Sequence, residues 1–187
     1  MHDSKLILDE RGMDMVLSRM AYEILERNAA HEDLVLVGIR TRGVFLAQRL
    51  QALLKQIAQL NVPLGILDIT LYRDDLSHGT HHPVLQKTEI SFSLDDKIVI
   101  LVDDVLYTGR TVRSAMDGLM DFGRPQAIQL LVLVDRGHRE LPIMPDYVGK
   151  HVPSSPDHQV MVRMCEEDSH DSVTVSYASR RQVDSAV

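Results

Sequence analysis

The residues best suited to chemistry lie together in the stretch ILVDDVLYTGRT, residues 100–111. An apolar run is followed by two adjacent carboxylates, Asp103 and Asp104, and then by a Thr-Gly-Arg-Thr turn at 108–111. A helical apolar pattern comes next, so the turn exposes backbone N–H groups at the positive end of a helix dipole, which favours an anion. We expect a phosphate here, with Gly109 allowing its close approach. The two acids would accept hydrogen bonds from the hydroxyls of a sugar and stabilise positive charge on its ring.

Other interpretations of the acidic pair stay open at this point. Asp103 and Asp104 could cap the following helix, or they could hold a divalent metal as in receiver domains and phosphatases. The turn is not a Walker phosphate loop, because the Gly-Lys-Ser/Thr sequence is missing. The pair and a Thr-Gly-X-Thr turn at this spacing together favour a sugar phosphate.

Apolar patterns predict the elements that position this stretch. Runs typical of buried strands occupy 34–39, 97–102 and 127–134, alternation predicts a half-covered strand at 64–72, and shorter strands are expected near 159–163 and 173–177. Helical stripes occupy 13–25, 46–57 and 112–120. Strands alternating with helices indicate an α/β fold with a central parallel sheet flanked by helices. Ligands bind beyond the carboxyl ends of such strands, where the turns 40–43, 103–111 and 135–139 are expected.

The segment 73–96 differs from the rest of the chain, because it is polar and has little apolar pattern. A stretch of this length inside a compact domain is typical of a flexible lid or binding loop, and a short β-arm within it is compatible with the pattern. His78, His81 and His82 invite a metal, but no carboxylate pattern accompanies them, so we expect solvent-exposed histidines. Residues 1–187 are expected to form one domain with a frayed tail at 179–187.

Composition narrows the classes of protein to which the chain can belong. The formal net charge of −7 argues against a general nucleic-acid coat but leaves room for a local basic face. The single cysteine, Cys165, excludes an internal disulfide framework and a cysteine-built zinc site. It is expected to be a small apolar filler, and it suggests a reducing, cytoplasmic compartment. No signal-peptide pattern and no run of the ~18 apolar residues of a membrane span is found, so no membrane partner is expected.

The stretch 99–111 resembles the phosphoribosyl pyrophosphate (PRPP) motif of the type I phosphoribosyltransferases. Three further blocks extend the resemblance to most of the chain: LVGIRTRGVFLAQRL, DITLYRDDL and LVDRGHRELPI. The resemblance implies the type I phosphoribosyltransferase fold, with a flexible hood loop at about 73–96. It points to a branch of the family whose members are uracil phosphoribosyltransferases and also regulate pyrimidine biosynthesis operons.

The resemblance also implies roles for single residues. Asp103 and Asp104 would hold the ribose 2′ and 3′ hydroxyls and, with Arg42, form the catalytic set. The 5′-phosphate would lie against Tyr107, Thr108, Gly109, Arg110 and Thr111. Arg40, Thr41, Arg42 and Gly43 would form a pyrophosphate loop, often built around a non-proline cis peptide, and Arg73 of the hood would touch the pyrophosphate. Uracil would contact Arg136 and the backbone near Val160, and Mg²⁺ would arrive on PRPP rather than in a fixed protein site.

The implied reaction is displacement of pyrophosphate from C1 of PRPP by uracil N1, which gives UMP. A purine phosphoribosyltransferase is the competing enzyme. Many purine enzymes of this class carry an acid at the position of Tyr107, so the tyrosine argues against a purine substrate.

A second activity of the same branch is RNA binding. Its members, as dimers, bind a stem-loop of pyr messenger RNA when UMP or UTP is present, and this promotes transcription attenuation. The candidate RNA contacts here are Ser18, Arg19, Arg27, Arg40 and Lys150. Against them, Tyr22 and Met144 stand where polar or basic residues are expected. A regulator with little catalysis and an enzyme without RNA binding therefore remain alternatives, and a homodimer or higher homo-oligomer is expected.

Overall fold

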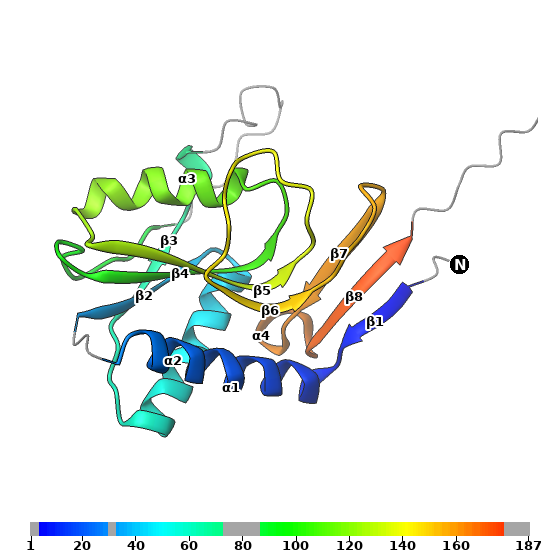
Figure 1. Ribbon diagram of the computed structural model, residues 1–187, viewed down its shortest axis with the longest axis horizontal. Coiled ribbons are helices and arrows are strands. Elements are labelled where there is room, and N and C mark those ends of the chain that lie inside the picture. Colours follow the sequence, from blue (N-terminus) through cyan, green and yellow to red (C-terminus); the bar gives the residue numbers. More distant parts are fainter. Residues whose placement is uncertain (1–3, 30–32, 73–86, 178–187) are drawn as a thin grey trace, which may run out of the picture.

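The computed structural model of the protein describes residues 4–29, 33–72 and 87–177, and its centre is a five-stranded sheet (Figure 1). The strand order is β3-β2-β4-β5-β6, and every neighbouring pair is parallel. The strands are β2 (Leu34–Ile39), β3 (Leu64–Leu67), β4 (Ile98–Leu106), β5 (Ala127–Asp135) and β6 (Tyr147–His151). The predicted α/β fold with a central parallel sheet is confirmed.

Helices cover both faces of this sheet. α1 (Glu10–Arg27) and α2 (Arg42–Ala58) lie on one face, and α3 (Arg110–Leu119) lies on the other (Figure 1). The alternation of side chains along β4 explains the two layers: Ile100 and Val102 pack with α1 and α2, whereas Val99 and Leu101 pack with α3. The site turns are thereby fixed to a core that is covered on both sides.

A smaller antiparallel sheet has the order β1-β8-β7. It is formed by β1 (Ser4–Leu8), β7 (His158–Arg163) and β8 (Ser172–Tyr177), and the short helix α4 (Cys165–Asp168) connects β7 to β8. Val162, Val173 and Val175 are buried in the same apolar cluster as α1 and α2. The second sheet therefore shares an apolar core with α1, α2 and the first sheet.

Several elements differ from the prediction. The strand expected at 64–72 ends at Leu67 and is followed by a 3₁₀ turn, Thr70–Tyr72. β4 continues to Leu106, so Asp103 and Asp104 lie in its last residues rather than after its end. β1, β6 and α4 had no counterpart in the prediction.

Part of the expected hood loop is described by the structure. Glu89 forms an antiparallel bridge with Ile66 on the edge of β3, in agreement with the β-arm that the pattern allowed. Arg73, His78, His81, His82 and the tail 179–187 lie outside the described residues. Within residues 4–29, 33–72 and 87–177, no helix is both long enough and apolar enough to cross a bilayer.

Candidate active site

One cavity of about 350 Å³ lies at the carboxyl ends of β2, β3 and β4. We call it the acidic cavity. Its lining comes from segments far apart in the sequence: Arg40, Thr41, Arg42, Asp68, Ile69, Thr70, Asp103, Asp104, Val105 and Thr111. The parallel register explains the meeting, because Gly38 of β2 pairs with Val102 of β4 and Ile39 of β2 pairs with Leu67 of β3. The predicted loop 40–43, the acidic pair and the end of the phosphate turn are thus brought together around one space.

The two acids occupy different environments. Asp103 is only 6% exposed, and its Oδ1 accepts a hydrogen bond from the N–H of Asp104 at 2.9 Å. Burial, together with the negative charge of Asp104, raises the pKa of Asp103 well above its ordinary value. Burial also raises the pKa of Asp104, although the N–H of Val105 and the charge of Arg42 oppose this. The pair therefore holds protons more tightly than free aspartates do, and it would gain from a nearby positive charge or hydroxyl donors.

The loop 40–43 joins β2 to α2 across the cavity. The peptide bond between Arg40 and Thr41 is cis, as the family resemblance implied. Gly43 lies so close to β4 that a Cβ atom there would be 2.4 Å from the carbonyl oxygen of Val102. Glycine at this position therefore lets the loop lie directly against the residue that precedes the acidic pair.

The predicted phosphate turn is held by the segment that follows β5. Gly109 has φ 93° and directly precedes α3, a conformation that favours glycine. The carbonyl of Thr108 accepts hydrogen bonds from the N–H groups of Glu140 at 2.9 Å and Leu141 at 3.2 Å. Arg139 donates to the carbonyl of Tyr107 at 3.0 Å and pairs with Asp135 at 2.8 Å. The carboxyl end of β5 thereby fixes the shape of the turn.

A second cavity, of about 290 Å³, lies beside the turn after β5. We call it the 135–154 cavity, and its lining is Asp135, Arg136, Gly137, His138, His151, Pro153 and Ser154. Arg136 is 8% exposed, and its guanidinium carbon lies 4.1 Å from the centre of the Tyr107 ring. It donates to the carbonyls of Ser155 at 3.0 Å and His158 at 2.7 Å, so backbone groups hold its guanidinium in place.

Val160 was expected near the base, and His138 is a further residue beside the same cavity. His138 lines the 135–154 cavity, contacts the carbonyl of Ser154 through Nε2 and meets the Tyr107 ring edge-on at 6.1 Å. Val160 lies in β7, where its side chain packs partly buried against the main core.

Asp68 lines the acidic cavity but was missed by the sequence interpretation. It is 8% exposed, and its Oδ1 accepts hydrogen bonds from both the N–H and the hydroxyl of Thr70, at 2.9 and 2.5 Å. The predicted strand ran past it to residue 72, which hid that Asp68 follows the carboxyl end of β3. The rule that ligands bind beyond such ends, applied to this strand with the correct end, would have identified it.

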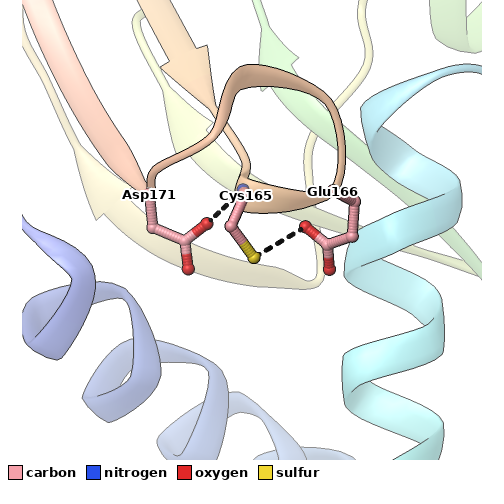
Figure 2. Close-up of side chains that lie close together, drawn as sticks. All are labelled: Cys165, Glu166 and Asp171. Carbon is pink, nitrogen blue, oxygen red and sulfur yellow. Dashed lines mark hydrogen bonds between the residues drawn. The ribbon is translucent and has the colours of Figure 1, made fainter.

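Cys165, Glu166 and Asp171 form a cluster whose ligand atoms lie within 4.8 Å of one another (Figure 2). The guanidinium of Arg49 supplies the positive charge there: it donates to Glu166 at 2.7 Å, to Asp171 at 2.6 Å and to the sulfur of Cys165 at 3.2 Å. Partial desolvation, and then the carboxylates of Glu166 and Asp171, raise the pKa of the Cys165 thiol. We interpret the cluster as a tie between α2 and the segment after β7. Cys165 is exposed, so the expectation of an apolar filler is wrong.

The candidate RNA contacts lie on α1 and at the end of β6. Arg19 donates to the carbonyls of Val148 at 2.9 Å and Gly149 at 2.7 Å and pairs with Glu23. Arg27 pairs with Asp146 at 2.7 Å. These two arginines thus have structural partners, whereas Ser18 is half-buried and Lys150 is exposed. Arg40 donates to the carbonyl of Lys87 at 3.1 Å, beside the acidic cavity.

Known proteins match nearly the whole chain. The family model of the phosphoribosyl transferase domain matches residues 3–170. The bifunctional protein PyrR of Pelotomaculum thermopropionicum is 59% identical over 169 residues, which cover 90% of this chain and 93% of that protein. The bifunctional protein PyrR of Halalkalibacterium halodurans is 55% identical over 174 residues, which cover 92% and 97%.

Solved structures share the fold at low sequence identity. A hypoxanthine phosphoribosyltransferase from Staphylococcus aureus has a TM-score of 0.69 and 18% identity, covering 94% of this chain and 93% of that one. The hypoxanthine phosphoribosyltransferase of Trypanosoma cruzi has a TM-score of 0.70 and 17% identity, covering 91% and 95%. The family resemblance read from the sequence is confirmed, and the chain belongs to the phosphoribosyltransferase family, in its group of bifunctional PyrR proteins.

Proposed function

We propose that the acidic cavity binds PRPP and that the chain uses it to convert uracil to UMP. The observation that carries the proposal is the meeting of the acidic pair, the loop 40–43 and Thr111 around one space of about 350 Å³. In this arrangement the 5′-phosphate lies on the turn Tyr107–Thr111, and the ribose hydroxyls donate to Asp103 and Asp104. The pyrophosphate group lies on residues 40–43, where Arg40 and Arg42 supply positive charge.

The reaction then requires no covalent bond to the protein. A bond forms between uracil N1 and C1 of the ribose, the bond from C1 to the pyrophosphate oxygen breaks, and the proton of uracil N1 is lost to the departing pyrophosphate or to water. Positive charge develops on the ribose ring, and Asp103 and Asp104 stabilise it because they lie in a poorly hydrated site. The arginines of the loop stabilise the departing pyrophosphate. The hood residue Arg73 would add to this charge, but it lies outside the described residues.

Mg²⁺ is the cofactor that we propose, carried by PRPP. The donor set fits a hard cation, because three carboxylates, Asp68, Asp103 and Asp104, line the acidic cavity. When bound, the ion would neutralise charge on the pyrophosphate.

The base is proposed to enter from the side of the 135–154 cavity. The N–H groups of Arg136 already hold the backbone of residues 155 and 158, and its flat face covers Tyr107. We therefore propose that the fixed side chain of Arg136 packs beside uracil. Nearby backbone groups, such as those near Val160, would form the hydrogen bonds to the base.

The enzymatic proposal is tested by turnover of PRPP and Mg²⁺ with uracil, hypoxanthine and guanine in parallel. UMP should form with uracil at least about 100-fold faster than IMP or GMP forms with the purines, since Tyr107 replaces the acid expected in a purine site. Turnover of a purine at a similar rate would overturn the choice of substrate. Binding of PRPP or UMP without turnover of any base would make the site a sensor.

RNA binding is the second function that we propose. Uridine nucleotides bound in the active site would favour a form that binds a stem-loop of pyr messenger RNA. With Arg19 and Arg27 engaged by partners, exposed Lys150 is the candidate for a phosphate contact. The chain's net charge of −7 means that such contacts must be local.

A gel-shift titration with a leader stem-loop, with and without UMP, tests this second function. UMP should tighten binding, and Lys150→Gln should weaken it and lower the slope of log affinity against log salt by about 1. Its UMP synthesis should be unchanged, because Lys150 does not line the acidic cavity. No shift at low salt in the presence of UMP would exclude the RNA function for this chain.

A further inference from the structure

Arg42, the first residue of α2, is held from outside the acidic cavity by a residue of the second sheet's connection. Its Nη2 donates to both carboxylate oxygens of Asp168, at 3.1 and 3.0 Å, while the side chain also lines the acidic cavity. The Nε of Arg42 is buried, and it has no hydrogen-bond partner among the described residues. A buried N–H of this kind requires an acceptor, and an oxygen of a bound anion would supply one. Nη2 of Arg42 is thus held by Asp168, whereas Nε is available to a ligand.

The carboxylate of Asp168 is itself fixed by the backbone. Its Oδ2 accepts the N–H of Met164 at 3.0 Å, and Met164 is fully buried in the main core. This N–H and, to a lesser degree, Arg42 lower the pKa of Asp168, so the carboxylate is ionised at neutral pH. The carboxylate of Asp168 therefore stays ionised and in a fixed position beside Arg42.

A second arginine, Arg49, also links α2 to the segment that follows β7. Arg49 lies seven residues after Arg42 on α2, which places both on one face of the helix. Arg49 binds Glu166 and Asp171, which flank Asp168 in the sequence. The segment after β7 would thus stay attached to α2 through Arg49 even if the contact between Asp168 and Arg42 were lost.

We infer that Asp168 is a positioning residue for the reaction: it orients Arg42 toward the pyrophosphate group of PRPP. The inference rests on the proposed role of Arg42 in the pyrophosphate loop. An unrestrained arginine has many rotamers, and fixing one of them on binding costs entropy that a preorganised side chain has already lost. The carboxylate of Asp168 also offsets part of the positive charge of Arg42, but it contacts only one terminal nitrogen of the guanidinium. Orientation is therefore expected to outweigh the loss of charge.

The test is Asp168→Asn, which keeps the size of the side chain and removes its charge. Affinities for PRPP and for pyrophosphate, both with Mg²⁺, should fall about tenfold. The affinity for UMP should change less than about twofold, because UMP has the ribose 5′-phosphate but no pyrophosphate. Glu167→Gln is the matched control: it removes one carboxylate from an exposed neighbour on the same turn and should leave all three affinities unchanged.

Two further variants separate positioning from other effects. Asp168→Glu restores a carboxylate and should recover part of the lost PRPP affinity. In an Arg42→Gln background, Asp168→Asn should cause no additional loss, because the residue through which it acts is gone.

The results distinguish failure of the inference about Asp168 from failure of the proposed function. PRPP binding by Asp168→Asn that equals or exceeds that of the wild type would overturn the inference. Equal weakening of PRPP and UMP, or failure of both Asp168 variants to fold, would assign Asp168 a structural role and overturn it as well. The proposed function fails separately: in that case the wild type does not bind PRPP, or Arg42→Gln binds it as tightly as the wild type.

Discussion

Asp104→Asn should lower kcat/KM for UMP synthesis by about 10²–10³-fold while the chain stays folded. The amide matches the carboxylate in size, and its oxygen can still accept the N–H of Val105, which Asp104 Oδ1 accepts at 2.8 Å. What it lacks is negative charge beside the ribose ring, in a site where burial has removed most competing water. The loss should therefore appear in catalysis rather than in folding.

The measurement is steady-state turnover with PRPP and uracil, together with thermal unfolding of the same preparations. Asp117→Asn serves as the control, because Asp117 is an exposed acid of α3 that pairs with Arg113. It removes the same charge and should leave turnover within about twofold of the wild type. If Asp104→Asn retained more than a third of the activity, the proposed ribose contact would be wrong.

The same acidic pair gives the wild type a characteristic pH dependence. Both pKa values are raised, Asp103 most, so the ionised form that stabilises the ribose is lost on acidification at a pH above the ordinary value of about 4. Folding stability responds with the opposite sign. A carboxyl whose folded pKa is raised contributes most stability at low pH, and this contribution is lost as the pH rises from about 4 through the folded pKa. Activity should therefore decline on acidification at a higher pH than ordinary aspartates would give, and before the fold is lost. Asp104→Asn removes the negative charge that helps to raise the pKa of Asp103, so the decline should shift to lower pH in this variant.

Local patterns in the sequence were sufficient for much of the site. The acidic pair and the turn 108–111 follow a buried strand, and the loop 40–43 follows another, so parallel topology alone brings them to one edge. The bounds of β2 were predicted to the residue because all six of its residues are buried and form an unbroken apolar run.

The parts that escaped prediction depend on contacts between distant residues or on weak patterns. β6 has only two buried residues of five, Tyr147 and Gly149, and therefore no apolar run. Asp168 meets Arg42 across 126 positions of the sequence, a separation that no local periodicity encodes. The surroundings of Cys165 are polar because Arg49 of α2 contacts its sulfur. The number of cysteines in the sequence does not predict this contact.

Gly43→Ala should disable the enzyme although it changes neither the arginines of the loop 40–43 nor the acidic pair. The new Cβ would lie 2.4 Å from the carbonyl oxygen of Val102 and 3.3 Å from the Cα of Asp103. Val102 cannot move easily, because β4 is paired there on both sides, with Gly38 of β2 and Leu131 of β5. The loop 40–43 must move instead, and overpacking of this kind costs about 1–3 kcal/mol.

The functional loss should exceed that cost, because the shift separates the pyrophosphate loop from the acidic pair. A displacement of about 1 Å between reacting groups can reduce turnover by about 100-fold, and we expect kcat/KM for PRPP to fall by that amount. Urea unfolding and turnover of Gly43→Ala should be compared with Gly65→Ala, whose Cβ would meet only side-chain atoms, those of Ile90 at 3.0 Å, Phe92 at 3.4 Å and Val37 at 3.5 Å. Side chains can yield where backbone cannot, so Gly65→Ala should keep most of its activity. Normal PRPP kinetics in Gly43→Ala would mean that the loop does not need its contact with β4, and the geometry proposed for the site would have to be abandoned.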